Sequence, residues 1–243
     1  MKSKNHDSGF NSFMALLRRE LSSYFQTPVA YVVGIVFLGI VSVRFFSVFF
    51  LFDRVELRQL FASLPLLLAL LMPALSMKLV AEERRRGTYE LLATLPLNNR
   101  EIVLAKFFAL WITGLFILLP TSVFVITVKS FGPLDFGPVA GGYLGTALLL
   151  AVYGAAGLFS SAAARNETIA LILGLVITLS LALLNSFLIL MPTAIVPLVD
   201  FIGIGSHFSG FAQGVIDSRS LVYLLSLTVF FLVLAERQLT RDR

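Results

Sequence analysis

Six runs of apolar residues divide this chain, and five of them are each long enough to cross a membrane as a helix. A spanning helix needs about 20 predominantly apolar residues. The sequence has 58% hydrophobic and only 14% charged residues, which is more apolar than a soluble domain with a buried core requires. We therefore predict an all-α integral membrane protein with a single domain, residues 1–243. The expected transmembrane helices are 29–50, 60–80, 102–128, 139–164, 168–190 and 218–236.

Two of these runs differ from the others, the fourth in its glycine spacing and the sixth in its length. Gly137, Gly141 and Gly145 recur at four-residue intervals in the fourth run, which predicts that another helix approaches it closely. The sixth run is uninterrupted only over 221–235 and needs the residues before it to reach across, with Arg219 extending toward the headgroups.

An amphipathic segment precedes the first run. Between residues 8 and 27, apolar side chains recur at three- and four-residue intervals, which is the period of a helix. A helix with one apolar and one polar face lies in the membrane interface rather than across the bilayer. We expect an interface helix over 8–27, with these residues as candidates for a functional role: Phe13, Leu17, Arg18, Arg19, Glu20 and Leu21.

The distribution of Lys and Arg predicts the orientation of the chain. With the N-terminus inside, 14 of the 19 basic residues fall on inner segments and 5 on outer segments. Inner loops of membrane proteins carry the excess of positive charge. We therefore expect both ends in the cytoplasm (N-in/C-in). The excess of basic residues behind the net charge of +5 then lies on the cytoplasmic side, beside anionic lipid. The positive charge therefore no longer indicates a nucleic-acid partner.

Several kinds of chemistry lack the residues that they need. The chain has no cysteine and only two histidines, so it offers neither a Cys/His zinc set nor an HExxH pair. It also has no phosphate-binding GxxxxGK[ST] loop. Acidic residues are nearly absent from the interiors of the spans, which argues against an ion-coupled transporter. We expect no enzyme, no cofactor and no metal in this chain.

Arg44 is the one charge clearly inside a predicted span. Two interpretations stay open for this side chain. It can extend along the helix to reach the outer headgroups. Alternatively, it faces a cavity or a dimer partner within the membrane, as intramembrane charges commonly do.

The longest inner loop covers residues 81–100. We expect it to begin with a charged segment and to continue as a short helix. Pro96 ends this helix, and Asn98 can then cap the third span, with Glu101 completing a capping box. The loop is either a solvated connection whose arginines set the topology, or a rigid docking element joined directly to two membrane helices. A partner that moves a docking element over 82–97 would move both spans.

Three stretches of the chain resemble one family. Residues 82–106 (EERRRGTYELLATLPLNNREIVLAK) resemble the coupling-helix region of ABC type-2 permeases. Residues 18–31 (RRELSSYFQTPVAY) are similar to the interface helix of the same family. Residues 206–226 (SHFSGFAQGVIDSRSLVYLLS) resemble the branch that includes gliding-motility permeases and, more distantly, permeases of nitrous oxide reductase maturation. The first match rests on Gly87, Thr88, Glu90, Leu91, Leu92, Pro96, Glu101, Val103 and Lys106.

The resemblance implies a function and its partners. Such permeases sit in the bacterial inner membrane, pair as dimers, and dock two cytoplasmic ATPase subunits that hold the ATP and Mg²⁺. The second permease is a further copy or a relative that bears a periplasmic domain. The helix over 8–27 either transmits the motion of the ATPase subunits to the membrane helices or only anchors the chain in the membrane. The implied ATPase-docking residues are Glu82, Glu83, Arg84, Gly87, Thr88, Glu90, Leu91, Leu92, Leu95 and Pro96.

The outer loop 191–217 is too apolar for a solvated connection, and the family implies re-entrant helices there. His207 is either a packed, hydrogen-bonded residue or a ligand or pH sensor. Asp217 either caps or pairs with Arg219, or contacts substrate. The resemblance over residues 206–226 also includes Phe208 and Phe211.

Two functional hypotheses remain. The first is a permease subunit of an ATP-driven exporter. The second is a scaffold or mechanotransmission subunit that relays ATPase motion to periplasmic partners without moving a substrate. Both use the same docking to an ATPase and differ in whether anything crosses the membrane.

Overall fold

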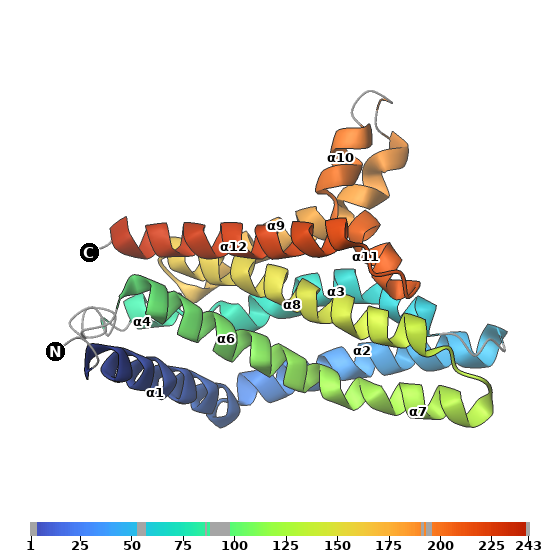
Figure 1. Ribbon diagram of the computed structural model, residues 1–243, viewed down its shortest axis with the longest axis horizontal. Helices are drawn as coiled ribbons and strands as arrows, with labels where there is room; N and C mark the ends of the chain where they lie inside the picture. The colour runs from blue at the N-terminus through green and yellow to red at the C-terminus, as the bar shows by residue number, and fades with distance from the viewer. Residues whose placement is uncertain are drawn as a thin grey trace.

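The computed structural model describes residues 4–52, 57–85, 87, 98–190, 192 and 196–241, and these residues form helices joined by turns, with no strand. Six helical segments are long and apolar enough to cross a membrane. The predicted all-α fold and its six apolar helices are therefore confirmed. The segments run side by side along the long axis of the molecule (Figure 1).

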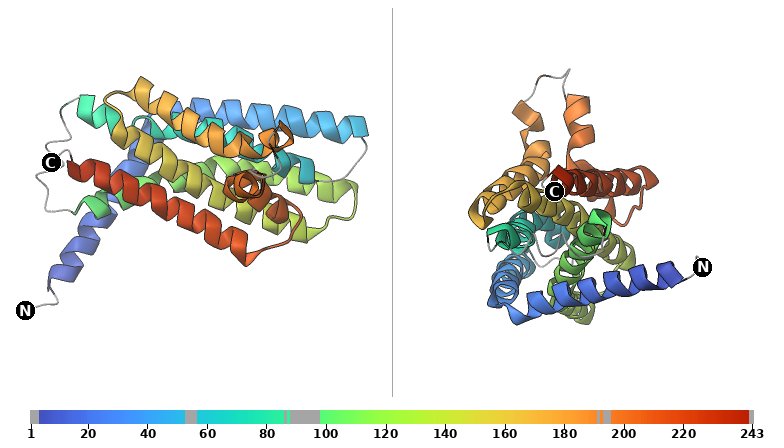
Figure 2. Two further views of the ribbon diagram at one scale, coloured as in Figure 1. Left: turned by 90° about the horizontal axis from the view of Figure 1, so that it is seen from above. Right: turned by 90° about the vertical axis from the view of Figure 1, so that its left-hand side faces the viewer.

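The helix α8 (Phe136–Ala163) lies at the centre of the bundle and is the most buried of the six. It packs against α3 (Arg58–Ser76), α9 (Glu167–Leu183), α6 (Asn99–Leu118) and α12 (Ser218–Arg241). In contrast, α2 (Pro28–Phe52) is attached mainly through α3, at one side of the bundle (Figure 2). Much of the apolar surface of α2, α9 and α12 is exposed, as expected for helices that face lipid.

Small residues on α8 let α11 (Ile204–Ala212) approach its backbone. A Cβ atom on Gly141 would lie 2.5 Å from the carbonyl oxygen of Phe211, and one on Gly145 would lie 2.7 Å from the Phe211 Cβ. The predicted close approach at these two glycines is confirmed. Gly137 is different, since the nearest atom to its Cβ position is the Asp135 carboxylate at 3.3 Å, which caps the same helix.

The second and third predicted spans are not continuous helices. The helix α3 ends at Ser76, four residues before the expected boundary, and the turn 77–80 leads into the short helix α4 (Ala81–Arg85). In the third span, α6 passes through the 3-10 turn η1 (Leu119–Thr121) into α7 (Ser122–Phe131). Pro120 lies at this break, because proline lacks the N–H that an uninterrupted helix would use.

The predicted fifth span is shorter than expected as an α-helix, and the sixth is longer. After α9 the chain continues as the 3-10 segment η2 (Leu184–Leu190), which packs against α10 (Val196–Ile202). These two segments project sideways from the bundle, and α11 then returns to it (Figure 1). The helix α12 spans 24 residues rather than the 218–236 expected, because it continues through the charged residues at its C-terminal end.

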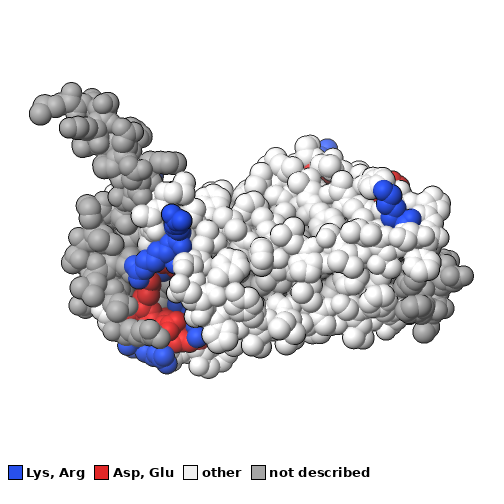
Figure 3. Space-filling view, turned by 90° about the horizontal axis from the view of Figure 1, so that it is seen from below, with Lys and Arg blue, Asp and Glu red and all other residues white. Residues whose placement is uncertain are grey.

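The two ends of the bundle differ in what they hold. One end, which we call the α4 end, holds α4, the start of α6 and the C-terminal end of α12 (Figure 1). Charged side chains gather at the ends, whereas the visible surface between them carries almost none (Figure 3). The N-terminal helix α1 (Lys4–Gln26) crosses the bundle at the α4 end instead of joining it lengthwise (Figure 2).

Candidate functional site

Lys106 is a charged residue with only 1% of its surface exposed, two turns into the apolar helix α6. Its Nζ donates to the Glu83 Oε1 atom at 2.8 Å, to the Glu20 Oε1 atom at 3.2 Å and to the Leu79 carbonyl oxygen at 2.8 Å. The three donors of the ammonium group thus have three acceptors. We call this set, Lys106 with Glu20, Glu83 and the Leu79 carbonyl, the Lys106 junction.

The junction connects three parts of the chain that are far apart in sequence. Glu20 belongs to α1, Glu83 to α4, and Lys106 to α6. A buried charge that loses its partner is strongly unfavourable, so each of these helices is held in place by the other two. The arrangement fixes the relative positions of α1, α4 and α6 at one point.

The start of α6 sets the position of Lys106. The Asn98 backbone N–H donates to the Glu101 carboxylate at 3.1 Å, and the predicted capping box is present. A capping box satisfies N–H groups that the first turn of a helix leaves free. It therefore fixes where α6 begins, and Lys106 then faces the interior.

Apolar contacts and a tyrosine attach α1 beside the junction. Phe13 and Leu17 pack on a small cluster that includes Leu16 and Ile102. The Tyr24 hydroxyl donates to the Leu75 carbonyl oxygen at 3.1 Å. Burial, and to a smaller extent the charge of Glu20, raise the pKa of Tyr24 well above its usual value, so the hydroxyl keeps the proton that it donates.

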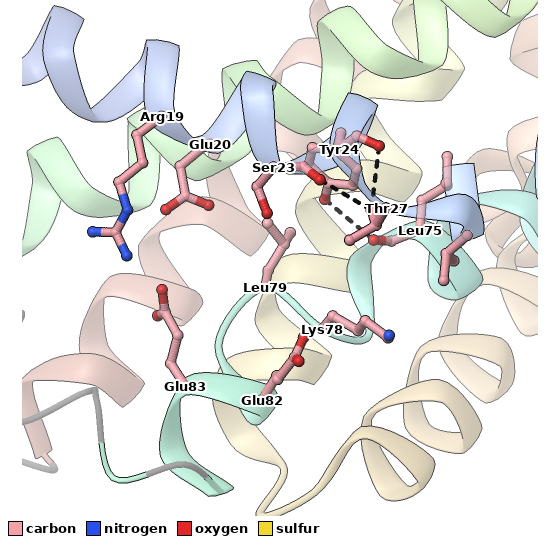
Figure 4. Close-up of a pocket in the computed structure, with 11 residues that line it drawn as sticks. Arg19, Glu20, Ser23, Tyr24, Thr27, Leu75, Lys78, Leu79, Glu82 and Glu83 are labelled. Carbon is pink, nitrogen blue, oxygen red and sulfur yellow. Dashed lines mark hydrogen bonds between the residues drawn. The ribbon is translucent and has the colours of Figure 1, made fainter. Parts of the chain in front are cut away.

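A cavity of about 360 Å³ opens between α1 and the α3–α4 turn, next to the junction. Arg19 and Glu20 point into it from α1, and Glu83 points toward them from α4 (Figure 4). Lys78 and Glu82 lie on the α3–α4 side. Charges of both signs line this cavity, so it lies in a polar environment rather than among lipid tails.

The α3–α4 turn is also attached to the centre of the bundle. The Ser161 hydroxyl of α8 accepts from the backbone N–H groups of Val80 at 3.0 Å and Ala81 at 3.2 Å, and donates to the Met77 carbonyl oxygen at 3.1 Å. Further along α4, Arg85 forms an ion pair with Glu167 of α9 at 3.2 Å. The turn therefore cannot move without affecting α8 and α9.

The other flank of the segment 82–97, at the start of α6, is attached to α12. The Arg100 Nε atom lies 2.8 Å from the Glu236 carboxylate, and the Asn99 amide donates to the Thr240 hydroxyl at 3.1 Å. Arg100 is exposed, so this pair contributes little to stability. It does bring the C-terminal end of α12 next to the start of α6.

Part of the predicted docking segment 82–97 lies outside the described residues. This part includes Thr88, Glu90, Leu91, Leu92, Leu95 and Pro96. Of the rest, Glu82, Glu83 and Arg84 belong to α4, and the Arg84 Nη1 atom lies 3.4 Å from the Ala164 carbonyl oxygen. Gly87 has a φ of +70°, a conformation that favours glycine.

The predicted residues of α1 divide between two roles. Glu20 is in the junction, and Phe13 and Leu17 hold α1 on α6. Arg18 and Arg19 are exposed, and Leu21 is half-buried. From the sequence, Lys106 is only one of the residues that match the family motif. The signal that could have identified it is a lysine within an apolar run, which needs partners.

The outer-loop candidates lie at the opposite end and take no part in the junction. His207 Nδ1 is 3.2 Å from the Ser220 hydroxyl, His207 Nε2 is 3.0 Å from the Phe201 carbonyl oxygen, and the ring stacks on Tyr223. These contacts favour the packed, hydrogen-bonded interpretation of His207. The Asp217 carboxylate accepts from the Arg219 backbone N–H at 2.9 Å, as a cap of α12 does.

The other two outer-loop candidates are core residues. Phe208 and Phe211 are buried and pack against the glycines of α8. Among the described residues, no group of three or more His, Cys, Asp or Glu side chains is arranged to hold a metal ion.

Comparison with known families agrees with the arrangement of six apolar helices. Residues 12–241 match the model of a family described as ABC-2 family transporter protein. The chain belongs to this family. A search among curated proteins gives no match.

Members of the ABC-2 family are multi-pass membrane transport subunits that work with an ATPase subunit. The match covers nearly the whole chain, from α1 to the end of α12. The Lys106 junction thus lies within the ABC-2 domain.

Proposed function

We propose that this ABC-2 chain is the permease subunit of an exporter, driven by a separate cytoplasmic ATPase that docks on residues 82–97. The observation that carries this proposal is the Lys106 junction. It connects α4, which begins the docking segment, with α6, which follows it. A push on the segment would therefore reach a spanning helix through a buried ion pair rather than through a loop.

The route of the motion follows the contacts. From α4 it passes through Glu83 and Lys106 to α6, and through Ser161 to α8 at the centre of the bundle. Through Glu20 it also reaches α1, which braces the junction from the side. In this role the helix α1 transmits or resists the motion in addition to anchoring the chain.

The orientation that we propose is N-in/C-in. The sequence count of 14 inner and 5 outer basic residues supports it. The gathering of α4, the start of α6 and the C-terminal end of α12 at one end of the bundle is what this orientation requires, because all three must then lie on the same side of the membrane. The α4 end then faces the cytoplasm, where an ATPase would be.

The partners follow from the same proposal. ATP and Mg²⁺ are held by the ATPase dimer, since this sequence has no phosphate-binding loop. The chain pairs with a second permease subunit in the bacterial inner membrane. That subunit is either another copy or, as in the gliding-motility branch, a permease with a periplasmic domain.

Co-purification of this chain with a candidate ATPase subunit tests the docking. We expect Leu92→Asp and Glu90→Arg each to abolish association. Leu92→Asp places a charge at an apolar contact, and Glu90→Arg reverses the charge at a polar contact. Val215→Asp is the control, since Val215 is exposed in the connection between α11 and α12, which lies at the end of the bundle opposite to α4 (Figure 1). Unchanged association of both docking variants, with the chain still folded, would show that residues 82–97 are not the docking segment.

A further inference from the structure

A second cavity, of about 520 Å³, lies at the end of the bundle opposite to α4. Its walls come from α2, α3, the end of α9 with η2, and α11. It is separate from the Lys106 junction and shares no residue with it.

Two arginines line this cavity. Arg44 comes from α2, and Arg58 is the first residue of α3. Neither side chain makes a hydrogen bond or an ion pair with any residue that the structure describes. The described residues of the cavity wall include no Asp or Glu. The nearby Asp200 carboxylate accepts from the Asn185 side-chain amide at 3.0 Å and forms no ion pair with either arginine.

Because Arg44 and Arg58 have no partner among the described residues, an anion bound between them would be favourable. Arg58 lies at the N-terminal end of a helix, where the helix dipole disfavours a cation and favours an anion. Arg44 lies eight residues before the end of α2, which is about 12 Å along a helix. Charges at such depth pair with a partner or line a polar cavity. Of the two interpretations of Arg44, the structure favours the one in which it faces a cavity.

The rest of the cavity wall is largely apolar. Leu66 of α3 is 44% exposed, and Phe208 of α11 is buried behind the cavity surface. The side-chain amide of Gln213 has no hydrogen-bond partner among the described residues and can donate to an anion. A positive region beside an apolar wall fits a molecule that has an anionic head and an apolar chain.

We propose that this cavity binds one anionic phospholipid, with its phosphate between Arg44 and Arg58 and an acyl chain along Leu66. Arginine suits this role because its planar guanidinium can donate two hydrogen bonds to one phosphate. The site needs no ATPase, so it does not depend on the proposed function. The site also differs from the non-specific attraction between basic residues and anionic headgroups, because it binds a single lipid molecule.

Lipid titration of the full chain in detergent, followed by native mass spectrometry, tests this proposal. The probes are phosphatidylglycerol and phosphatidylcholine with identical acyl chains, and glycerol 3-phosphate as a head without a chain. We expect one phosphatidylglycerol per chain at low concentration. Arg44→Gln and Arg58→Gln should each weaken its binding about tenfold, the effect of losing a charge-assisted hydrogen bond.

Arg219→Gln is the matched control, because this exposed arginine lies at the same end but outside the cavity. It should leave binding unchanged. The melting temperature of each variant without lipid, and the variants Arg44→Lys and Arg58→Lys, distinguish lost binding from a damaged fold. The lysine variants keep the charge and should lose less affinity than the glutamine variants.

Three results would overturn the proposal. Equal binding of phosphatidylcholine and phosphatidylglycerol would show that the arginines select no anion. Binding of glycerol 3-phosphate as tight as that of the lipid would make the site one for a free anion. Equal loss of lipid binding in Arg219→Gln and in the two cavity variants would show that the arginines attract anionic headgroups non-specifically and form no site.

Discussion

Lys106 lies inside a spanning helix with almost none of its surface exposed, and three oxygen atoms surround its ammonium group. Two of these oxygens belong to carboxylates that are themselves largely buried. The effective cost of burying each ion is several kcal/mol, which the mutual attraction offsets only while all partners are present. The three residues therefore act as one unit.

Removing only the lysine should be strongly destabilising. In Lys106→Met the carboxylates of Glu20 and Glu83 stay buried without their cation, and we expect a loss of about 3–5 kcal/mol in the free energy of unfolding. Unfolding in mixed detergent micelles measures it. Arg100→Gln is the control, because its ion pair is exposed and its loss should be undetectable. Equal stability of the two variants would mean that the junction is not a buried network.

At the scale of elements, the close packing of α8 and α11 depends on glycine. A Cβ atom at Gly141 would come within 2.5 Å of a backbone oxygen of α11, and a backbone cannot move aside as a flexible side chain does. The same helix that the sequence marks with spaced glycines is the one that forms the centre of the bundle.

We expect Gly141→Ala to displace α11 and to destabilise the chain by about 1–3 kcal/mol, the usual cost of overpacking a well-packed interior. Gly39→Ala is the matched control, since no atom lies within 4 Å of a Cβ at Gly39. The thermal unfolding of both variants in detergent measures the difference. A Gly141→Ala protein as stable as the Gly39→Ala protein would contradict the packing described here.

The elements that the sequence predicts well are those defined by long apolar runs. All six appear as helices, because the bilayer requires about 20 apolar residues in each. The breaks were harder to predict. The turn 77–80 depends on Ser161, a residue some 80 positions away that satisfies its N–H groups. The sideways projection of η2 and α10 likewise depends on tertiary packing, which no local pattern reveals.

Of the candidate site, the sequence pattern indicated Glu20 and Glu83 but not that they meet. Only the crossing of α1 over the α4 end brings them to the same lysine. Tyr24 and Ser161 carry no local signal of their role, because their partners are backbone carbonyl and N–H groups that are distant in the sequence.

At the scale of the whole molecule, the proposed orientation can be tested without background, because the chain has no cysteine. We expect a membrane-impermeant maleimide to label Ser209→Cys from outside intact cells and to label Thr240→Cys only after the membrane is opened. Both residues are exposed. Ser209 belongs to α11 and Thr240 to the C-terminal end of α12, and these two elements lie at opposite ends of the bundle (Figure 1). The reverse labelling would invert the orientation and place the α4 end away from any cytoplasmic ATPase.

The central claim is that ATPase motion enters the membrane through the Lys106 junction. The most direct measurement is the maleimide labelling rate at Ser209→Cys in the assembled complex, with and without ATP. The comparison is the triple variant Glu20→Gln, Glu83→Gln and Lys106→Met, which removes all three charges together and leaves none unpaired. We predict that ATP changes the rate in the otherwise unaltered chain and not in the triple variant, although both still bind the ATPase. The same ATP-dependent change in both complexes would contradict the claim.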